Sequence, residues 1–452
     1  MNKRRIIAAA ALLGAALCLK AQPLQEGFFL RNYNRAYQYN PAIVGENDFI
    51  GVPNVLFTQQ NNAGAAAFLY PTDQGLVTGL HSSVPAATFL GNLPQSIRFH
   101  GDINATLVSY GFWKGGGFHT LDLNVRGNYG ASLPKELFQF AKQGTGSNPT
   151  DLSGISLDAG LFIELAYGYG RKLGDWLSVG GRVKLLLPMY GASYDISRFD
   201  VTAEEEKLAV KLRGDLYLTN RSGTIHTNKE GYWDLTSFSS REKLSFWPSG
   251  AGAAVDLGLL ATPAEGLSIS LSVLDLGGVY WYYGNRATTG GTATFEGLQE
   301  VTYEQLGGQA LKDMLLDAGN QFLSLLKPIG FYGHSWRFQK LHMQANLGVK
   351  YQMPFYRRLA AGASVRYAGA SGLPYWEGRG ALEVNPLDWL DVTANLGYGT
   401  RGMVFGLAAS VQFYRFQLTA AWEDGFGGTL AYSRTPLQPN FRTLSVGLTY
   451  NL

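Results

Sequence analysis

The sequence predicts an all-β protein: a transmembrane, antiparallel, up-and-down β-barrel of about 14 strands (range 12–16), with an N-terminal hatch-like segment and short loop helices. Three observations predict this fold class. The chain opens with a secretory signal, long segments alternate between apolar and polar residues, and no later apolar run is long enough to cross a membrane as a helix. A secreted soluble β-sandwich or propeller would also alternate, and it is the competing interpretation.

Residues 1–21 have the composition of a secretory signal peptide. Basic residues at 3–5 precede an apolar stretch at 6–19, and the small Ala21 ends a cleavage site. The apolar stretch is short for a bilayer span. The single cysteine, Cys18, lies within this segment, so we expect a mature chain without a disulfide or a cysteine nucleophile.

Alternation is clearest from Met343 to Met353, where apolar residues such as Leu347 and Val349 alternate with polar residues such as Asn346 and Lys350. The same period of two recurs in residues 120–129, 158–169, 176–187, 207–218, 391–398, 403–413, 416–423 and 444–452. Segments of about ten residues suit strands that cross a bilayer at a tilt. We therefore expect the apolar side chains to face lipid and the polar ones to face an enclosed lumen.

The connections between these segments also favour a membrane barrel. Short links at 399–402 and 414–415 alternate with much longer segments, and aromatic residues near strand ends, as at 279–285, predict interfacial girdles. The last strand, Leu444–Leu452, alternates to the final residue and is the expected contact for the barrel-assembly machinery. It must pair with the first strand, because an open edge in lipid leaves backbone groups unsatisfied.

The polar face carries charges of both signs, and we expect six of them in the lumen: Arg126, Glu164, Arg182, Lys184, Lys350 and Arg366. Opposite charges on consecutive strands attract strongly in a low-dielectric interior. They either neutralise one another and stiffen the wall, or form a constriction that filters solutes. Three bulky apolar residues are expected on the same inward face, as contacts for an apolar ligand or as part of a plug: Phe162, Trp176 and Leu186.

The chain divides into a signal peptide (1–21), an N-terminal segment without alternation (22–48) and the barrel (49–452). The segment at 22–48 either hangs in the periplasm or folds back into the lumen. Helices are predicted at 134–143, where a proline suits the first turn, and at 309–326, which has one apolar face.

Composition excludes several classes of function. Removing the signal's four basic residues from the total of 37 leaves 33 against 34 acidic residues, a net charge of −1, so nucleic acid is not an expected partner. The six histidines are dispersed without metal-ligand spacing, and no nucleophile elbow or phosphate-binding loop is present. We therefore expect no enzymatic activity, no metal and no cofactor.

Several blocks of the sequence resemble a domain-of-unknown-function family of Gram-negative outer-membrane barrel proteins, which is remotely similar to the long-chain fatty-acid channel family. The matching blocks are residues 39–46 (YNPAIVGE), 133–144, 162–188, 253–281 and the closing strand. In the fatty-acid channels an Asn-Pro-Ala motif belongs to an N-terminal hatch that blocks the lumen. The resemblance therefore implies that role for Asn40, Pro41 and Ala42, with an ordinary Asn-Pro turn as the alternative.

Together these features lead to one expected function and one alternative. The expected function is a monomeric channel, integral to the outer membrane of a Gram-negative bacterium and in contact with its lipid. It would pass small hydrophobic molecules and be gated by the N-terminal hatch. The alternative is a non-transporting barrel that serves as a component or anchor of a secretion or surface complex.

Overall fold

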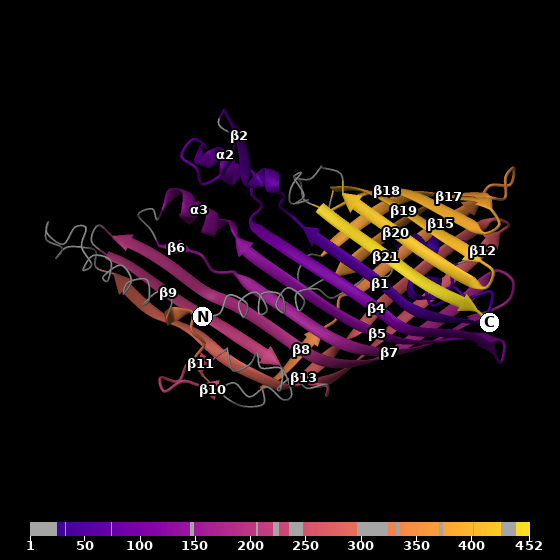
Figure 1. The fold of residues 1–452 in the computed structure, drawn as a ribbon, viewed down its shortest axis with the longest axis horizontal. Coiled ribbons are helices and arrows are strands. Elements are labelled where there is room, and N and C mark those ends of the chain that lie inside the picture. The colour runs from indigo at the N-terminus through magenta and orange to yellow at the C-terminus, as the bar shows by residue number, and fades with distance from the viewer. Residues whose placement is uncertain are drawn as a thin grey trace.

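The computed structural model describes residues 25–31, 33–73, 75–144, 149–204, 207–219, 226–234, 247–295, 324–330, 335–369, 374–400, 402–425 and 440–452. Within them, long strands form one antiparallel sheet that closes on itself (Figure 1). The fold is a closed all-β barrel of 14 strands, as the sequence predicts. The predicted signal peptide at 1–21, and the predicted helix at 309–326 apart from 324–326, lie outside the described residues.

The wall consists of strands β1 (Phe49–Asn61), β4 (Ser96–Lys114), β5 (Gly117–Pro134), β7 (Ser156–Lys172), β8 (Leu177–Glu204), β9 (Lys207–Thr219), β12 (Gly250–Ala264), β13 (Leu267–Phe295), β14 (Ser335–Lys340), β15 (Met343–Gln352), β16 (Leu359–Gly369), β17 (Tyr375–Leu387), β18 (Leu390–Gly399), β19 (Gly402–Phe413), β20 (Phe416–Gly425) and β21 (Asn440–Asn451). Strand β1 pairs with both β4 and β21, which closes the ring. Two places in the ring are each occupied by two of these strands, one after the other along the barrel wall. Strands β9 and β12 both lie between β8 and β13, and strands β14 and β15 both pair with β13.

The two faces of each strand differ sharply in exposure. In β15, Leu347 is 49% exposed whereas Asn346 is 1% exposed. The same pattern, with apolar residues outside and polar residues inside, recurs around the wall, for example at Leu165 beside Glu164. A soluble sandwich would bury its apolar face between sheets. The alternative fold is therefore wrong, and the apolar face is the surface that lipid covers.

The two ends of the barrel have different connections. Six links at one end are short, such as 115–116 between β4 and β5 and 414–415 between β19 and β20. This end also holds the start of β1 and the end of β21. Long links at the other end contain η3 (Ala65–Ala67), β2 (Leu69–Thr72), β3 (Gly75–Thr78), α2 (Ala86–Gly91), α3 (Lys135–Gln143), β6 (Thr150–Asp151), β10 (His226–Thr227) and β11 (Trp233–Asp234).

The helix predicted at 134–143 is α3, which begins directly after Pro134, ends at Gln143 and is followed by Gly144 at a positive φ (74°). Its Phe138 packs against Phe68 and Phe89, so α3, α2 and the small β2–β3 hairpin form an aromatic cap on the long-loop end. On the same side, β8, β9 and β13 run past the other strands, as Figure 1 shows. No helix in the described ranges is long and apolar enough to cross a membrane.

Exposed aromatic rings form two belts. Those near the short-turn end include Trp113, Tyr169, Trp176, Phe355 and Phe413, and those near the long-loop end include Tyr280, Tyr282, Trp336, Trp376 and Tyr398. Rings of this kind favour the headgroup level of a bilayer. The belts therefore mark the two edges of the apolar band, as predicted from residues 279–285.

The face assignment predicts the effect of adding a charge. Leu347→Arg, on the lipid-facing side of β15, should cost about 2–4 kcal/mol if it lies near mid-bilayer, whereas Phe355→Arg, in the short turn that follows β15, should cost about 0–1 kcal/mol. Folding into phospholipid vesicles at increasing urea measures both values. Equal losses at the two positions would contradict the placement of the apolar band.

Candidate functional site inside the barrel

An N-terminal segment lies within the ring of strands. The described part, 25–31 and 33–48, contains the turns η1 (Gln25–Phe28) and η2 (Ala36–Gln38). Its backbone and side chains bond to inward-facing wall groups on several sides: Arg31 N to Asp391 Oδ2 at 2.5 Å, Asn34 Nδ2 to Thr449 Oγ1 at 2.7 Å, and Ser272 Oγ to Tyr39 O at 2.7 Å. Because these wall residues face the lumen, the segment occupies the lumen.

The Asn-Pro-Ala motif is deeply buried and bonded to the wall. Asn40 is fully buried, and its Oδ1 accepts a hydrogen bond from Ala42 N at 2.9 Å, which closes a local turn. Its Nδ2 donates to Leu259 O at 2.8 Å and to Ser270 Oγ at 2.7 Å. The motif is therefore both a turn and an anchor to strands β12 and β13, so the two interpretations drawn from the sequence are compatible.

Glycines on the wall make room for the motif. A Cβ on Gly180 of β8 would overlap Pro41 O, one on Gly170 of β7 would lie 2.8 Å from it, and one on Gly258 of β12 would overlap Asn40 Oδ1. Real Cβ atoms do not approach so closely. Three adjacent wall strands thus lack side chains where the backbone of the segment touches them.

A layer of ion pairs fills the lumen next to the motif, on the side toward the long loops. Arg126 bonds Glu164 at 2.5 Å and Asp275 at 2.8 and 3.0 Å. Lys184 bonds Asp275 at 2.6 Å and Asp256 at 2.7 Å. All of these side chains are at least nine-tenths buried. An isolated charge there would be costly, so the pairs neutralise one another and tie β5, β7, β8, β12 and β13 together.

The same layer holds the N-terminal segment. Arg182 bonds Asp256 at 3.2 Å and also bonds Asp122, which accepts a hydrogen bond from Tyr37 Oη at 2.6 Å. The Arg182 guanidinium lies 5.4 Å from the centre of the Tyr37 ring. Burial, and then the Asp122 carboxylate, raise the pKa of Tyr37 well above its ordinary value, so Tyr37 stays protonated and keeps donating.

Two more of the predicted lumen charges contact the segment elsewhere. Lys350 Nζ donates to Phe29 O at 2.7 Å and pairs with Glu383. Arg366 Nε donates to Asn346 Oδ1 at 2.8 Å, and its guanidinium lies 5.9 Å from the centre of the Tyr39 ring. All six charges that the sequence places in the lumen are found there, paired or hydrogen-bonded.

The lumen charges expected from the sequence did not include the acidic partners Asp122, Asp256 and Asp275. The first two stand at polar positions of alternating segments and could have been found by the same pattern. Asp275 could not, because it has a positive φ (60°) at a register shift between β12 and β13, where the alternation breaks. Aspartate tolerates this left-handed conformation better than most residues.

Of the three apolar residues predicted to point inward, two do. Phe162 and Leu186 are buried in a cluster with Trp281, Val279, Tyr217, Ala254 and Leu341, on the long-loop side of the ion pairs. The prediction for Trp176 is wrong, since its side chain is 58% exposed. Strand β8 begins at Leu177, so Trp176 lies in the preceding turn, where strand alternation does not apply, and its ring belongs to the aromatic belt.

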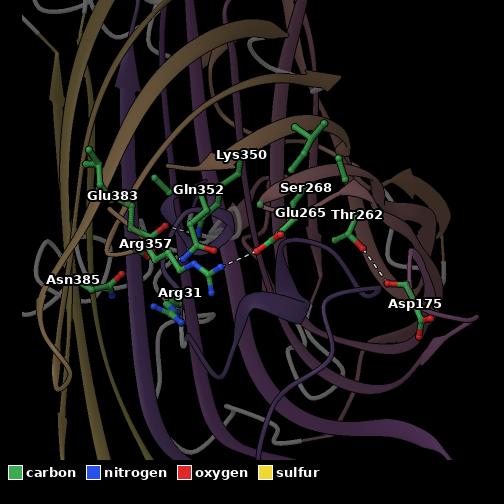
Figure 2. A pocket seen from close by; sticks show the side chains of 15 residues that line it. Arg31, Asp175, Thr262, Glu265, Ser268, Lys350, Gln352, Arg357, Glu383 and Asn385 are labelled. Atoms are coloured by element: carbon green, nitrogen blue, oxygen red, sulfur yellow. Dashed lines mark hydrogen bonds and ion pairs between the residues drawn. The ribbon is translucent and has the colours of Figure 1, made fainter. Parts of the chain in front are cut away.

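Two cavities open beside the segment at the short-turn end. One of about 450 Å³ is lined by Arg31 of the segment and by wall and turn residues that include Lys350, Glu383 and Arg357 (Figure 2). A second, of about 260 Å³, is lined largely by the segment itself and shares Arg31, Ser268 and Lys350 with the first. The segment therefore separates polar space at this end from the apolar cluster beyond the ion pairs.

Residues 41–422 match the model of a family of unknown function, DUF5723. The chain belongs to this family. This match confirms the resemblance to a domain-of-unknown-function family. In this DUF5723 protein the matched range begins at Pro41 and covers most of the barrel. Among curated proteins, none matches it.

Several solved structures are similar to this chain at low sequence identity. The Pseudomonas putida toluene transporter TodX is 8% identical with a TM-score of 0.46, covering 96% of this chain and 98% of that one. A Pseudomonas aeruginosa FadL homologue is 12% identical (TM-score 0.46; 93% and 94% covered), and the Ralstonia pickettii toluene transporter TbuX is 9% identical (TM-score 0.46; 93% and 94% covered). The barrel fold of this DUF5723 protein is shown by its own strand pairing.

The ion-pair layer predicts a contrast between two arginines. Arg126→Ala leaves Glu164 and Asp275 buried without their guanidinium and should cost about 3–5 kcal/mol. Arg286→Ala removes an exposed pair with Asp215 and should cost about 0–1 kcal/mol. Urea unfolding of the barrel in detergent micelles measures both. A small loss at Arg126 would mean that the lumen is well hydrated rather than dry.

Proposed function

We propose that this protein is a non-enzymatic channel of the Gram-negative outer membrane that passes small hydrophobic molecules, with residues 25–48 acting as its hatch. The observation that carries the proposal is the way the segment is seated. It occupies the lumen and is held there by non-covalent contacts alone: hydrogen bonds, ring contacts and a glycine-lined groove.

The class of solute follows from what lines the lumen on the long-loop side. There Phe162, Leu186 and Trp281 turn inward on strands whose other inward positions are largely polar. Apolar side chains in a lumen offer contacts to an apolar molecule, while the polar cavities at the short-turn end suit release into water. Passage in this direction requires both the hatch and the ion pairs beside it to shift.

A second candidate function has its own support. Arg126 on β5 and Asp275 on β13 bond directly across the interior, so the lumen is crossed by wall-to-wall contacts as well as by the segment. A barrel filled in this way also suits a non-transporting anchor of a surface or secretion complex. Under either function we propose a monomer, inserted through its closing strand Leu444–Leu452.

Deleting residues 22–44 separates the two functions. If the segment is a hatch, the deletion should make proteoliposomes several-fold more permeable to small solutes, because it empties the short-turn end and removes Tyr37, which holds Asp122 of the ion-pair layer in place. A solute-uptake or swelling assay, with intact barrel as the reference, measures this. Vesicles that stay as tight as the reference would remove the channel proposal and leave the anchor.

A milder change tests the seating of the motif. Gly258→Val places a side chain where Asn40 Oδ1 lies, and overpacking of this kind costs about 1–3 kcal/mol. That cost corresponds to about a 5- to 150-fold larger unseated fraction, and permeability should rise with it. Gly380→Val is the matched control, since a Cβ at this position would meet nothing within 4 Å. Equal permeability of the two variants would contradict the hatch.

A further inference from the structure

Two histidines from opposite sides of the barrel meet in the lumen. His100 lies on β4 and His342 lies in the link between β14 and β15. Around the wall, β5, β7, β8, β12 and β13 separate these positions on one side. Nevertheless the two imidazole rings are only 5.9 Å apart, centre to centre. Side chains from opposite sides of the wall therefore meet at this level.

The surroundings of His100 have one unusual feature. The residue is 3% exposed, and its Nε2 lies 3.2 Å from Asp102 Oδ1. Its other ring nitrogen, Nδ1, is buried and has no hydrogen-bond partner among the described residues. A buried polar nitrogen without a partner is destabilising, so this atom calls for a ligand. A carboxylate on one nitrogen of an imidazole, with the other nitrogen free, is the arrangement found in carboxylate–histidine–metal sites.

The ring separation fits a shared metal ion. Imidazole nitrogens bind Zn²⁺ at about 2.0–2.1 Å, which places the centres of two ligating rings roughly 5–6.5 Å apart, depending on the angle at the metal. The observed 5.9 Å falls inside this range. We propose that His100 and His342 bind a divalent first-row transition metal ion of the kind that imidazole favours, such as Zn²⁺.

The site would have two protein ligands and open positions. Among the described residues, no group of three or more His, Cys, Asp or Glu side chains could enclose a metal ion. Water, or a polar group of a molecule entering the lumen, completes the coordination. The ion would join β4 to the link before β15 and so narrow the lumen at the level of these two histidines.

Zinc titration of the purified full-length barrel in detergent tests this site. We expect isothermal titration calorimetry to show one Zn²⁺ per chain for the unmodified protein, and no such binding in His100→Gln or His342→Gln. Asp102→Asn, which removes the carboxylate behind His100, should weaken binding about 10- to 100-fold. His119→Gln is the control, because His119 packs among Phe112, Tyr167 and Tyr169 on the outer face and should bind as the unmodified protein does.

Folding of each variant is checked by its resistance to detergent unfolding on an unheated gel. Absence of zinc binding by the unmodified protein would overturn the proposal. So would binding that survives in both His100→Gln and His342→Gln, or that is lost equally in His119→Gln. None of these outcomes depends on the permeability assays, so the metal site and the hatch stand or fall separately.

Discussion

The structure depends on one constraint, that backbone groups in lipid have no water to bond with. Strand β1 meets this constraint by pairing with both β4 and β21, so that first and last strands share a complete ladder. A closed sheet has only an inner and an outer face, and period-two alternation assigns every side chain to one of them. The apolar residues take the lipid, and the polar residues have to be satisfied inside.

That second requirement explains what fills the lumen. Buried charges are tolerated only in pairs, and here Arg126, Arg182 and Lys184 are matched by acidic groups from neighbouring and opposite strands. The N-terminal segment supplies further partners, since its backbone and its Tyr37 and Asn40 bond to inward-facing wall groups. The segment is in this sense part of the polar core.

Because the segment both fills the lumen and bonds to the wall, its contacts determine what the proposed gate has to break to open. The segment touches the wall through short polar contacts, through glycines and through buried apolar clusters that include Phe28, Leu30 and Tyr37. Beyond it lie first the ion pairs and then the apolar cluster around Phe162 and Trp281. An opening of the lumen is therefore a rearrangement of paired charges as well as a displacement of the segment, which links conduction to the electrostatics of the wall.

The sequence by itself determined the fold class, the lipid-facing and lumen-facing sides, and the six lumen charges, because alternation is a local property of a strand. It did not reveal strands such as β1 and β4, whose bulges at Val52/Asn54 and Thr106/Val108 break the period. Only the tertiary structure decided that Asp275 completes the ion pairs, that Trp176 turns outward and that His100 meets His342. Each of these depends on where a bulge, a strand end or the curvature of a closed wall places a side chain, and these are set by pairing between residues far apart in the chain.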